Sequence, residues 1–283
     1  MKITKTIESV RKLVKAARSK GKKIGFVPTM GALHIGHISL IKKAKRKTDF
    51  VIVSIFVNPT QFGPSDDFKK YPRPIKKDLA ICRKAGVDVV FAPAAEQMYS
   101  RENLTWVDVE KLTEQLCGRF RQGHFRGVAT VCVKLFNIVA PDIAFFGQKD
   151  AQQVVVIKRM VADLNMPLKI AVCPTVRQAD GLAVSSRNQY LTEQAKKDAT
   201  YIYKALKKSR SLIKAGVRKS KKIIGEMKKV LRPVPSIKIE YISIVDAETL
   251  QELEKITGEV LIAVAVKIGS TRLIDNILVD VNG

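Results

Sequence analysis

Residues 24–40 read IGFVPTMGALHIGHISL, and this stretch predicts a strand, a loop and a helix in immediate succession. The apolar run Ile24–Val27 is typical of a strand, and after Gly36 apolar residues return at helical spacing. His34 and His37 would then stand at the helix N-terminus, where backbone N–H groups and partial positive charge favour a phosphate. On local residues alone, a tight turn with two incidental surface histidines stays open. A zinc pair is disfavoured, because no third His or Cys follows at ligand spacing.

The overall composition indicates an intracellular globular protein. The 283 residues are 46% hydrophobic, which is enough for two domains that each have a core. The longest apolar runs have the length of strands, so we expect no transmembrane helix, and the first twenty residues lack the apolar region of a secretory signal. The four cysteines are scattered without a CxxC pair, which predicts neither disulfides nor a zinc knuckle. We therefore expect a cytoplasmic protein.

The positive charge is concentrated in one segment. The formal net charge is +25, and residues 196–232 contain 14 Lys and Arg against only Asp198 and Glu226. Such a stripe can bind nucleic acid, but it can also be the solvated face of two helices. Few aromatic residues are interleaved for base stacking, so we favour the solvated face and expect no nucleic-acid partner.

The order of apolar segments predicts two domains. In the first part of the chain, strand-like runs alternate with helical patterns, as in a doubly wound parallel α/β (Rossmann-like) domain, which we place at residues 1–175. From 176 to 283 two helices precede the strands without that alternation, which predicts a smaller α+β domain. The strands expected in the first domain lie at 24–27, 49–57, 87–92, near Thr105–Val109, at 143–146 and at 169–173.

Four loops rich in polar and glycine residues each follow a predicted strand, at residues 28–37, 58–63, 147–150 and 174–188. The carboxyl ends of parallel strands share one edge of a sheet, so these loops should meet around one cleft. The sequence offers no Ser-His-Asp or Cys-His set and no GxxxxGK[ST] loop, which argues against a covalent intermediate and a P-loop. Positioning and electrostatic stabilisation at phosphorus fit better. The candidate phosphate ligands are His34, His37, Lys149, Ser185, Ser186 and Arg187, and the candidate substrate amides are Asn58, Gln61 and Gln153.

Several longer strings carry a family resemblance. The HIGH segment resembles the HxGH signature of the nucleotidylyltransferase and class I aminoacyl-tRNA synthetase superfamily, a moderately specific match. Over essentially the whole chain, the sequence resembles the pantoate–β-alanine ligase family. The strings that carry this resemblance are PTMGALHIGHISL, SIFVNPTQFGPSDDF, GHFRGVAT, FGQKDAQQ and RQADGLAVSSRNQYL.

The resemblance implies a two-step ligation and a set of site residues. Pantoate would attack the α-phosphate of Mg-ATP to give pantoyl adenylate and pyrophosphate, and β-alanine would then displace AMP. The catalytic residues would be His34, His37 and Lys149, with His37 assisting departure of pyrophosphate. Gln61 and Gln153 would bind pantoate, and Gln61 and Asn58 would bind β-alanine. ATP would contact Met30, Gly31, Ala32, Leu33, His34, Ile35, Gly36, His37, Gly147, Gln148, Lys149, Asp150, Val176, Val184, Ser185, Ser186 and Arg187.

The resemblance also implies that Mg²⁺ is held mainly by the ATP phosphates, without protein metal ligands, and that the chain forms a homodimer. Closure of the second domain would exclude water from a reactive acyl adenylate. Ile35 departs from the family, which usually has an acidic residue at this position. Two rival hypotheses stay open: another enzyme of the HxGH superfamily, despite the lack of a KMSKS string, and a nucleic-acid-binding module based on residues 196–232.

Overall fold

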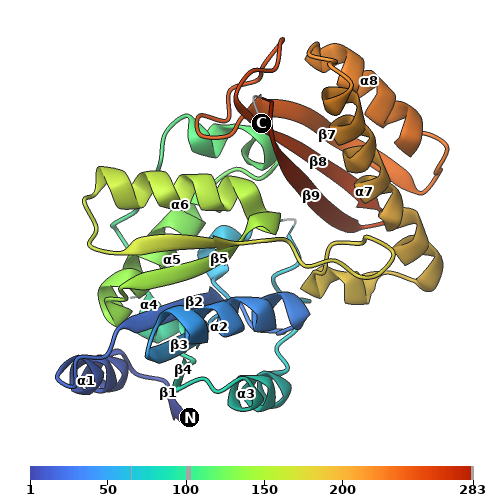
Figure 1. Cartoon of the computed structure of the whole chain (residues 1–283). Coiled ribbons are helices and arrows are strands. Elements are labelled where there is room, and N and C mark those ends of the chain that lie inside the picture. Colours follow the sequence, from blue (N-terminus) through green and yellow to red (C-terminus); the bar gives the residue numbers. More distant parts are fainter. Residues whose placement is uncertain (65, 100–102, 282–283) are drawn as a thin grey trace. The chain divides into compact units, whose positions relative to one another are not determined.

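The computed structural model describes residues 1–64, 66–99 and 103–281, and the chain forms two compact units (Figure 1). The first unit comprises Met1–Thr113, Arg121–Gly147 and Val156–Pro174. The second unit comprises Glu114–Phe120, Gln148–Val155 and Thr175–Gly283.

The first unit is built on a six-stranded parallel sheet with the strand order β1-β4-β3-β2-β5-β6. From β2 the chain winds outward through β3 to β4, and it then returns to β5 and β6 on the other side of β2. This confirms the doubly wound fold and places its switch point between β2 and β5, where ligands bind in such sheets. The strands are β1 (Lys2–Thr4), β2 (Ile24–Thr29), β3 (Phe50–Ile55), β4 (Val89–Phe91), β5 (Ile143–Gly147) and β6 (Lys169–Cys173).

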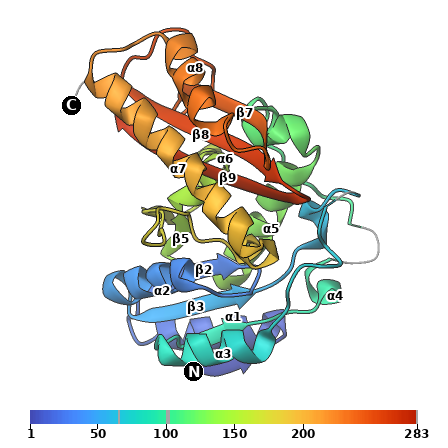
Figure 2. The ribbon, with the colours of Figure 1, turned by 90° about the vertical axis from the view of Figure 1, so that its right-hand side faces the viewer.

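The central strands are buried on both faces, which explains their nearly continuous apolar sequences. Val27 and Phe145 belong to a core cluster shared with residues of α2 and α3. Their neighbours Phe26 and Phe146 point to the other face, where both rings contact Phe136 of α5 at centroid distances of 6.4 and 6.3 Å. In Figure 2, α2 runs along β2 and β3. These helices are α2 (Ile35–Lys47), α3 (Ile75–Lys84) and α5 (His124–Val139).

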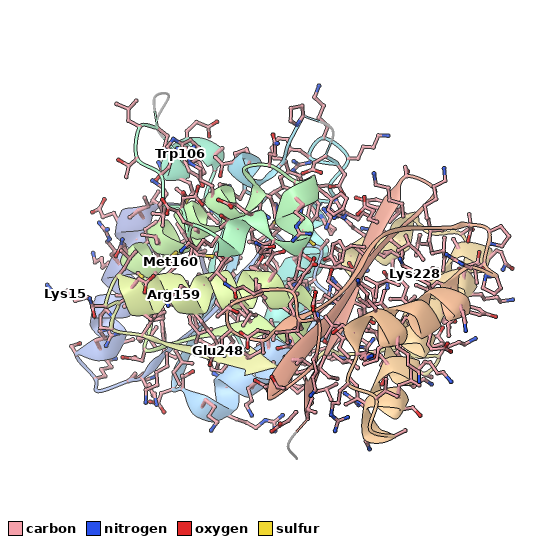
Figure 3. The ribbon with its side chains drawn as sticks, turned by 90° about the horizontal axis from the view of Figure 1, so that it is seen from above. Lys15, Trp106, Arg159, Met160, Lys228 and Glu248 are labelled. Carbon is pink, nitrogen blue, oxygen red and sulfur yellow. The ribbon has the colours of Figure 1, made fainter. Side chains whose placement is uncertain are left out.

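The remaining helices of residues 1–174 are short or amphipathic. In α6, Arg159 is exposed and pairs with Asp163, whereas the adjacent Met160 is 2% exposed (Figure 3). This alternation is what the helical spacing of apolar residues predicts. The other helices are α1 (Ile7–Arg18), α4 (Ala95–Met98), α6 (Ala151–Asp163), and the 3-10 turns η1 (Pro59–Gln61), η2 (Leu112–Glu114), η3 (Leu116–Phe120) and η4 (Gln148–Asp150).

The prediction of a strand near Thr105–Val109 is wrong. The segment lies outside both sheets, and the N–H of Val107 donates to the Thr130 hydroxyl of α5 at 3.0 Å. The Arg126 guanidinium lies over the ring of Trp106, which is labelled in Figure 3, at 4.9 Å from the ring centroid. Alternating apolar residues are typical of a strand, but here the neighbouring element is a helix whose main chain is already hydrogen-bonded.

The second unit has an antiparallel sheet in the order β7-β8-β9. Its core joins the sheet to α7 and α8 through residues such as Leu206, Met227 and Val264. Thr192 caps α7, since its side chain accepts the N–H of Ala195 at 3.2 Å. The elements are η5 (Ser186–Tyr190), α7 (Glu193–Lys214), α8 (Ser220–Leu231), β7 (Ile237–Asp246), β8 (Glu259–Ile268) and β9 (Thr271–Asp280).

The basic segment forms the outer faces of α7 and α8. Lys207 and Lys208 are exposed, while Ala205 and Leu206 on the same helix are fully buried. The absence of a nucleic-acid partner for this face stays a prediction. Among the described residues, no helix combines the length and the apolar character needed to cross a membrane.

Candidate active site

The turn that follows β2 has an unusual main-chain path. Gly31 and Ala32 both have positive φ, at 82° and 50°. The Thr29 hydroxyl donates to the Ser54 carbonyl at 2.7 Å and accepts the N–H of Gly31 at 3.1 Å. The turn is therefore tied to the adjacent strand β3 before the chain enters α2.

A buried carboxylate holds the next part of this turn. Asp78 of α3 is 1% exposed, and its two oxygens accept the N–H groups of Ala32 at 2.9 Å and Leu33 at 2.8 Å. Burial raises the pKa of Asp78, while these two hydrogen bonds act in the opposite direction. No motif in the sequence singles out this residue. Its position four residues before the buried Cys82, on the inward face of α3, could have revealed it.

The two histidines form a reciprocal cap on α2. Nδ1 of His34 accepts the N–H of Gly36 at 3.1 Å, and Nδ1 of His37 accepts the N–H of His34 at 3.3 Å. The ring centroids are 4.1 Å apart. Because a backbone N–H reaches each Nδ1, each neutral ring carries its proton on Nε2 and can donate from there. Both histidines thus lie at the helix N-terminus, as the sequence predicts.

Gly36 is required by this cap. A Cβ at this position would lie 2.9 Å from two atoms of the His34 ring, closer than real Cβ contacts allow. Ile35, between the two, is 54% exposed, so the motif presents an apolar side chain at the surface of the first turn.

The loop after β3 brings Asn58 and Gln61 to the loop after β2. Asn58 is 1% exposed and donates through Nδ2 to Oε1 of Gln61 at 3.1 Å. Gln61 is 8% exposed, and its Nε2 donates to the sulfur of Met30 at 3.2 Å. Thioether sulfur is a weak acceptor, and an amide nitrogen has two hydrogens. Gln61 therefore keeps donor capacity for a substrate oxygen.

Tyr99 completes the environment of Asn58 and was missed in the sequence. Its hydroxyl donates to Oδ1 of Asn58 at 2.8 Å, and the Thr60 hydroxyl donates to the same oxygen at 3.0 Å. Burial is the main reason that the pKa of Tyr99 is raised, which keeps the phenol protonated as a donor. The Asn58 amide is thereby fixed in one orientation.

The turn after β5 is organised by an asparagine of β9. Nδ2 of Asn276 donates to the carbonyls of Gln148 at 3.0 Å and Lys149 at 2.8 Å. Asn276 is 5% exposed, and Nζ of Lys149 lies 3.4 Å from Oδ1 of Asp150. Gln153 follows, half-buried, near the start of α6. Asn276 belongs to no motif singled out in the sequence, although the polar pair Asp275-Asn276 within an apolar strand could have revealed it.

The segment after β6 forms a small hairpin and then the η5 turn. The N–H of Val184 donates to the carbonyl of Val176 at 3.0 Å, so these two main-chain groups are already hydrogen-bonded to each other. Ser185 caps η5 by accepting the N–H of Arg187 at 3.3 Å. Ser185, Ser186 and Arg187 are half-buried in the second unit, which also contains Gln148–Val155.

The hairpin is anchored to β9 by a buried ion pair. Arg177 donates to both oxygens of Asp275, at 2.5 and 2.9 Å, and Asp275 is 4% exposed. The Arg177 guanidinium also lies 3.8 Å from the centroid of the Tyr203 ring. Paired, bidentate charges of this kind hold geometry well, so the segment that leads to Ser185 starts from a fixed point within its unit.

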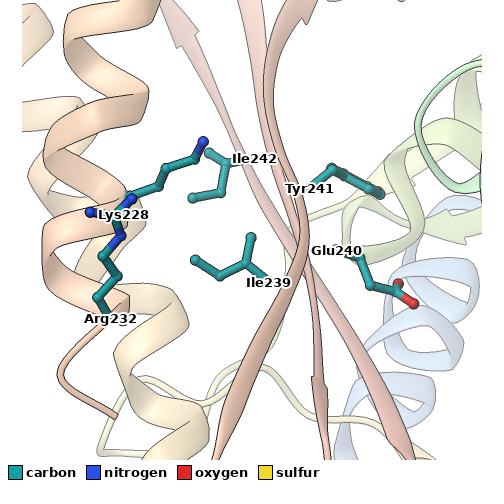
Figure 4. Close-up of a pocket in the computed structure, with 6 residues that line it drawn as sticks. All are labelled: Lys228, Arg232, Ile239, Glu240, Tyr241 and Ile242. Carbon is teal, nitrogen blue, oxygen red and sulfur yellow. The ribbon is translucent and has the colours of Figure 1, made fainter. Parts of the chain in front are cut away.

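The second unit also contains a hollow that is lined by residues of α8 and β7. It measures about 350 Å³ and lies between α8 and β7. Figure 4 shows Lys228 and Arg232 extending from α8, whereas Glu240 and Tyr241 lie on the opposite side of β7. None of the residues selected from the sequence lines this hollow.

The chain is similar over its whole length to proteins of one family. The family described as pantoate-beta-alanine ligase matches residues 2–278. The pantothenate synthetase of Moorella thermoacetica is 55% identical over 282 residues, covering 100% of both chains. The solved pantothenate synthetase of Thermus thermophilus matches with a TM-score of 0.94 at 42% identity, covering 99% of each chain. The Francisella tularensis pantoate-beta-alanine ligase, solved with β,γ-ATP and β-alanine, gives a TM-score of 0.81 at 39% identity and covers 98% of this chain and 97% of that one.

Proposed function

Because the chain belongs to the pantoate–β-alanine ligase family and is therefore a pantothenate-forming ligase, we propose that it activates pantoate as an acyl adenylate. An oxygen of the pantoate carboxylate attacks the α-phosphorus of ATP, the bond to the bridging oxygen breaks, and pyrophosphate leaves. The amine of β-alanine then attacks the acyl carbon, loses a proton, and displaces AMP. The ATP and β-alanine bound to the Francisella tularensis relative support both substrates.

The observation that carries the first step is the capped histidine pair. Main-chain N–H groups occupy Nδ1 of His34 and of His37, so each ring can donate from Nε2 at the N-terminus of α2. Negative charge increases on the pyrophosphate oxygens as the bond breaks, and fixed donors at a helix N-terminus stabilise it. We assign His37 to the departing pyrophosphate and His34 to phosphate binding.

The buried amides are proposed to hold the acid and the amine substrates. Gln61 has an N–H available beyond its contact with Met30, and it can donate to pantoate. Gln153 is proposed as the second pantoate ligand, and Asn58, fixed by Tyr99, as a β-alanine ligand together with Gln61. An amide that is already oriented loses little conformational entropy when a substrate binds.

The remaining nucleotide contacts rest on the family motifs. We propose that ATP contacts Met30–His37, Gly147–Asp150, the main chain of Val176 and Val184, and Ser185–Arg187, with Lys149 near the phosphates. The described residues contain no group of three His, Cys, Asp or Glu side chains placed as metal ligands. Mg²⁺ is expected to arrive on the ATP phosphates, where it neutralises charge. A homodimer stays a prediction that sedimentation can check.

The experiment that tests the proposal is isotope exchange between pyrophosphate and ATP. Adenylation before ligation predicts exchange that requires pantoate and Mg²⁺ and does not require β-alanine. Exchange that proceeds without pantoate would contradict the assignment. A dependence on β-alanine would instead contradict the separate adenylate intermediate.

A further inference from the structure

The third histidine of the chain has no role in the reaction described above. His124 is the first residue of α5 and follows Gly123, whose φ is 74°. Its Nδ1 lies 2.7 Å from the main-chain carbonyl oxygen of Gln61, and its Nε2 lies 2.9 Å from Nη1 of Arg121. His124 therefore connects α5 to the loop that carries a proposed substrate ligand.

The partners of His124 determine where its proton lies. An arginine side chain can only donate hydrogen bonds, so Nε2 of His124 must accept. A carbonyl can only accept, so Nδ1 must donate to Gln61. Both contacts require the same neutral tautomer, with the proton on Nδ1, and both are satisfied by it.

An ion pair holds the arginine in place. Nη2 of Arg121 donates to Oδ2 of Asp66 at 2.8 Å, and the same oxygen accepts the N–H of Gly63 at 3.0 Å. Burial alone would raise the pKa of Asp66, but the hydrogen bonds from Arg121 and Gly63 and the positive charge nearby lower it. Asp66 thus stays ionised and orients Arg121 toward the histidine.

The same helix supports this loop at a second point. The carbonyl of Gly127 accepts Nδ2 of Asn58 at 3.1 Å. A Cβ on Gly127 would overlap the main chain at Thr60 and Gln61, so only glycine permits this close approach. The first turn of α5 therefore fixes the side chain of Asn58 and the main chain of Gln61 together.

We propose that His124 is a positioning residue, which sets the orientation of the Gln61 amide for pantoate through the Gln61 carbonyl. The proposal rests on the proposed function, in which Gln61 binds pantoate. It assigns a purpose to the GHFRG segment, and it predicts that only the Nδ1 donor of the ring is needed for pantoate binding.

Three variants separate the two ring nitrogens. In His124→Asn the side-chain N–H₂ takes the place of Nδ1–H, whereas in His124→Gln the amide reaches the place of Nε2. We expect His124→Ala and His124→Gln to raise the KM for pantoate in pyrophosphate exchange by about 3- to 10-fold, the scale of one neutral hydrogen bond. His124→Asn should stay within about twofold of the wild type on the same scale, and the KM for ATP should be unchanged in all three.

Two further measurements make the outcome decisive. Nitrogen-15 NMR of the wild type should show His124 as the Nδ1–H tautomer, and His124→Ala added to Gln61→Ala should cause no further rise in KM. If His124→Asn behaves like His124→Ala, or if the KM values for pantoate and ATP rise together, the inference is wrong. If the wild type exchanges without pantoate, the proposed function itself fails, and a pantoate-dependent wild type with unaffected variants contradicts only the inference.

Discussion

At the scale of single residues, His34 and His37 are held by main-chain N–H groups of their own helix turn. This arrangement uses the inner nitrogen of each ring and leaves the outer nitrogen as the donor. A residue that caps a helix and binds substrate with opposite edges of one ring can change both stability and rate when it is replaced. For variants at these positions, both the stability and the reaction rate therefore have to be measured.

His37→Ala should lower the rate of pantoate-dependent pyrophosphate exchange by ~10²–10³-fold, the usual effect of removing one transition-state donor. His37→Gln is the matched control, because its amide nitrogen can take the place of Nε2 and should restore part of the rate. Thermal unfolding of both variants checks that the cap on α2 is not the cause. Near-normal exchange in His37→Ala would remove this residue from the chemistry.

Asp78→Asn should become more stable relative to the wild type as the pH rises. The pKa of Asp78 is raised above its ordinary value of 3.8 in the folded protein. The folded state therefore binds this proton more tightly than the unfolded chain, and the stabilisation is lost as the pH rises through the folded pKa. Urea unfolding of both proteins from below pH 3.8 to neutral pH measures the difference, and a constant difference would contradict the raised pKa.

Asp66→Asn should show the opposite dependence. The pKa of Asp66 is lowered from 3.8 by Arg121 and Gly63, despite burial. Its ionised form therefore stabilises the folded protein above pH 3.8, and this contribution is lost as the pH falls through the folded pKa. The advantage of the wild type over Asp66→Asn should be largest at neutral pH and should shrink in acid. Urea unfolding of both proteins at neutral and at acidic pH measures this difference in stability. A stability advantage of the wild type that grows in acid would exclude the ion pair with Arg121.

At the scale of elements, the first turn of α5 decides where the loop after β3 can lie. Gly127 lets the helix approach the main chain of Thr60, and its carbonyl binds Asn58. Residues 118–127 are rich in glycine and arginine, yet α5 begins among them, at His124. Glycine inside a helix lowers its stability, but the close packing of Gly127 against η1 overrides that local preference.

Gly127→Ala should destabilise the protein by about 1–3 kcal/mol, the usual cost of overpacking. Gly225 in α8 is the matched control, because a Cβ there meets nothing within 4 Å. Gly225→Ala should stabilise the protein by about 0.5–1 kcal/mol through its better helix propensity. Denaturant unfolding measures both, and a stabilising Gly127→Ala would show that the loop can move away without loss.

At the scale of the whole molecule, the residues assigned to ATP belong to two compact units. The histidine pair lies in the first unit, and Lys149 and Ser185–Arg187 lie in the second. Each unit has its own core and its own anchoring contacts, such as Asp78 in the first and the Arg177–Asp275 pair in the second. A substitution in the second unit of the whole protein therefore tests whether ATP binding needs residues of both units.

Arg187→Ala should raise the KM for ATP by about 10- to 100-fold, the scale of one hydrogen bond to a charged group. Arg210→Ala, at an exposed position of α7, is the matched control and should leave the KM unchanged. Pyrophosphate exchange at varied ATP concentration provides both values. Equal KM values for the two variants would remove Arg187 from the ATP site.

The sequence by itself determined the features that depend on neighbouring residues. The strand, the glycine turn and the position of both histidines at the helix N-terminus follow from the local spacing of residues 24–40, and apolar runs predict parallel strands that bring the polar loops to one edge. The end of β5 at Gly147 and of β6 at Cys173 agrees with this. Local patterns also misled, because Thr105–Val109 has the alternation of a strand and no strand to pair with among the described residues.

Only the tertiary structure decided which side chains hold those loops in place. Asp78 binds main-chain groups 45 and 46 residues away, His124 binds a carbonyl 63 residues away, and Asn276 binds carbonyls 127 and 128 residues away. A sequence pattern reports the face on which a residue lies. The partner of a buried polar group is set by which main-chain donors and acceptors the fold brings within hydrogen-bonding distance, and that is decided by packing.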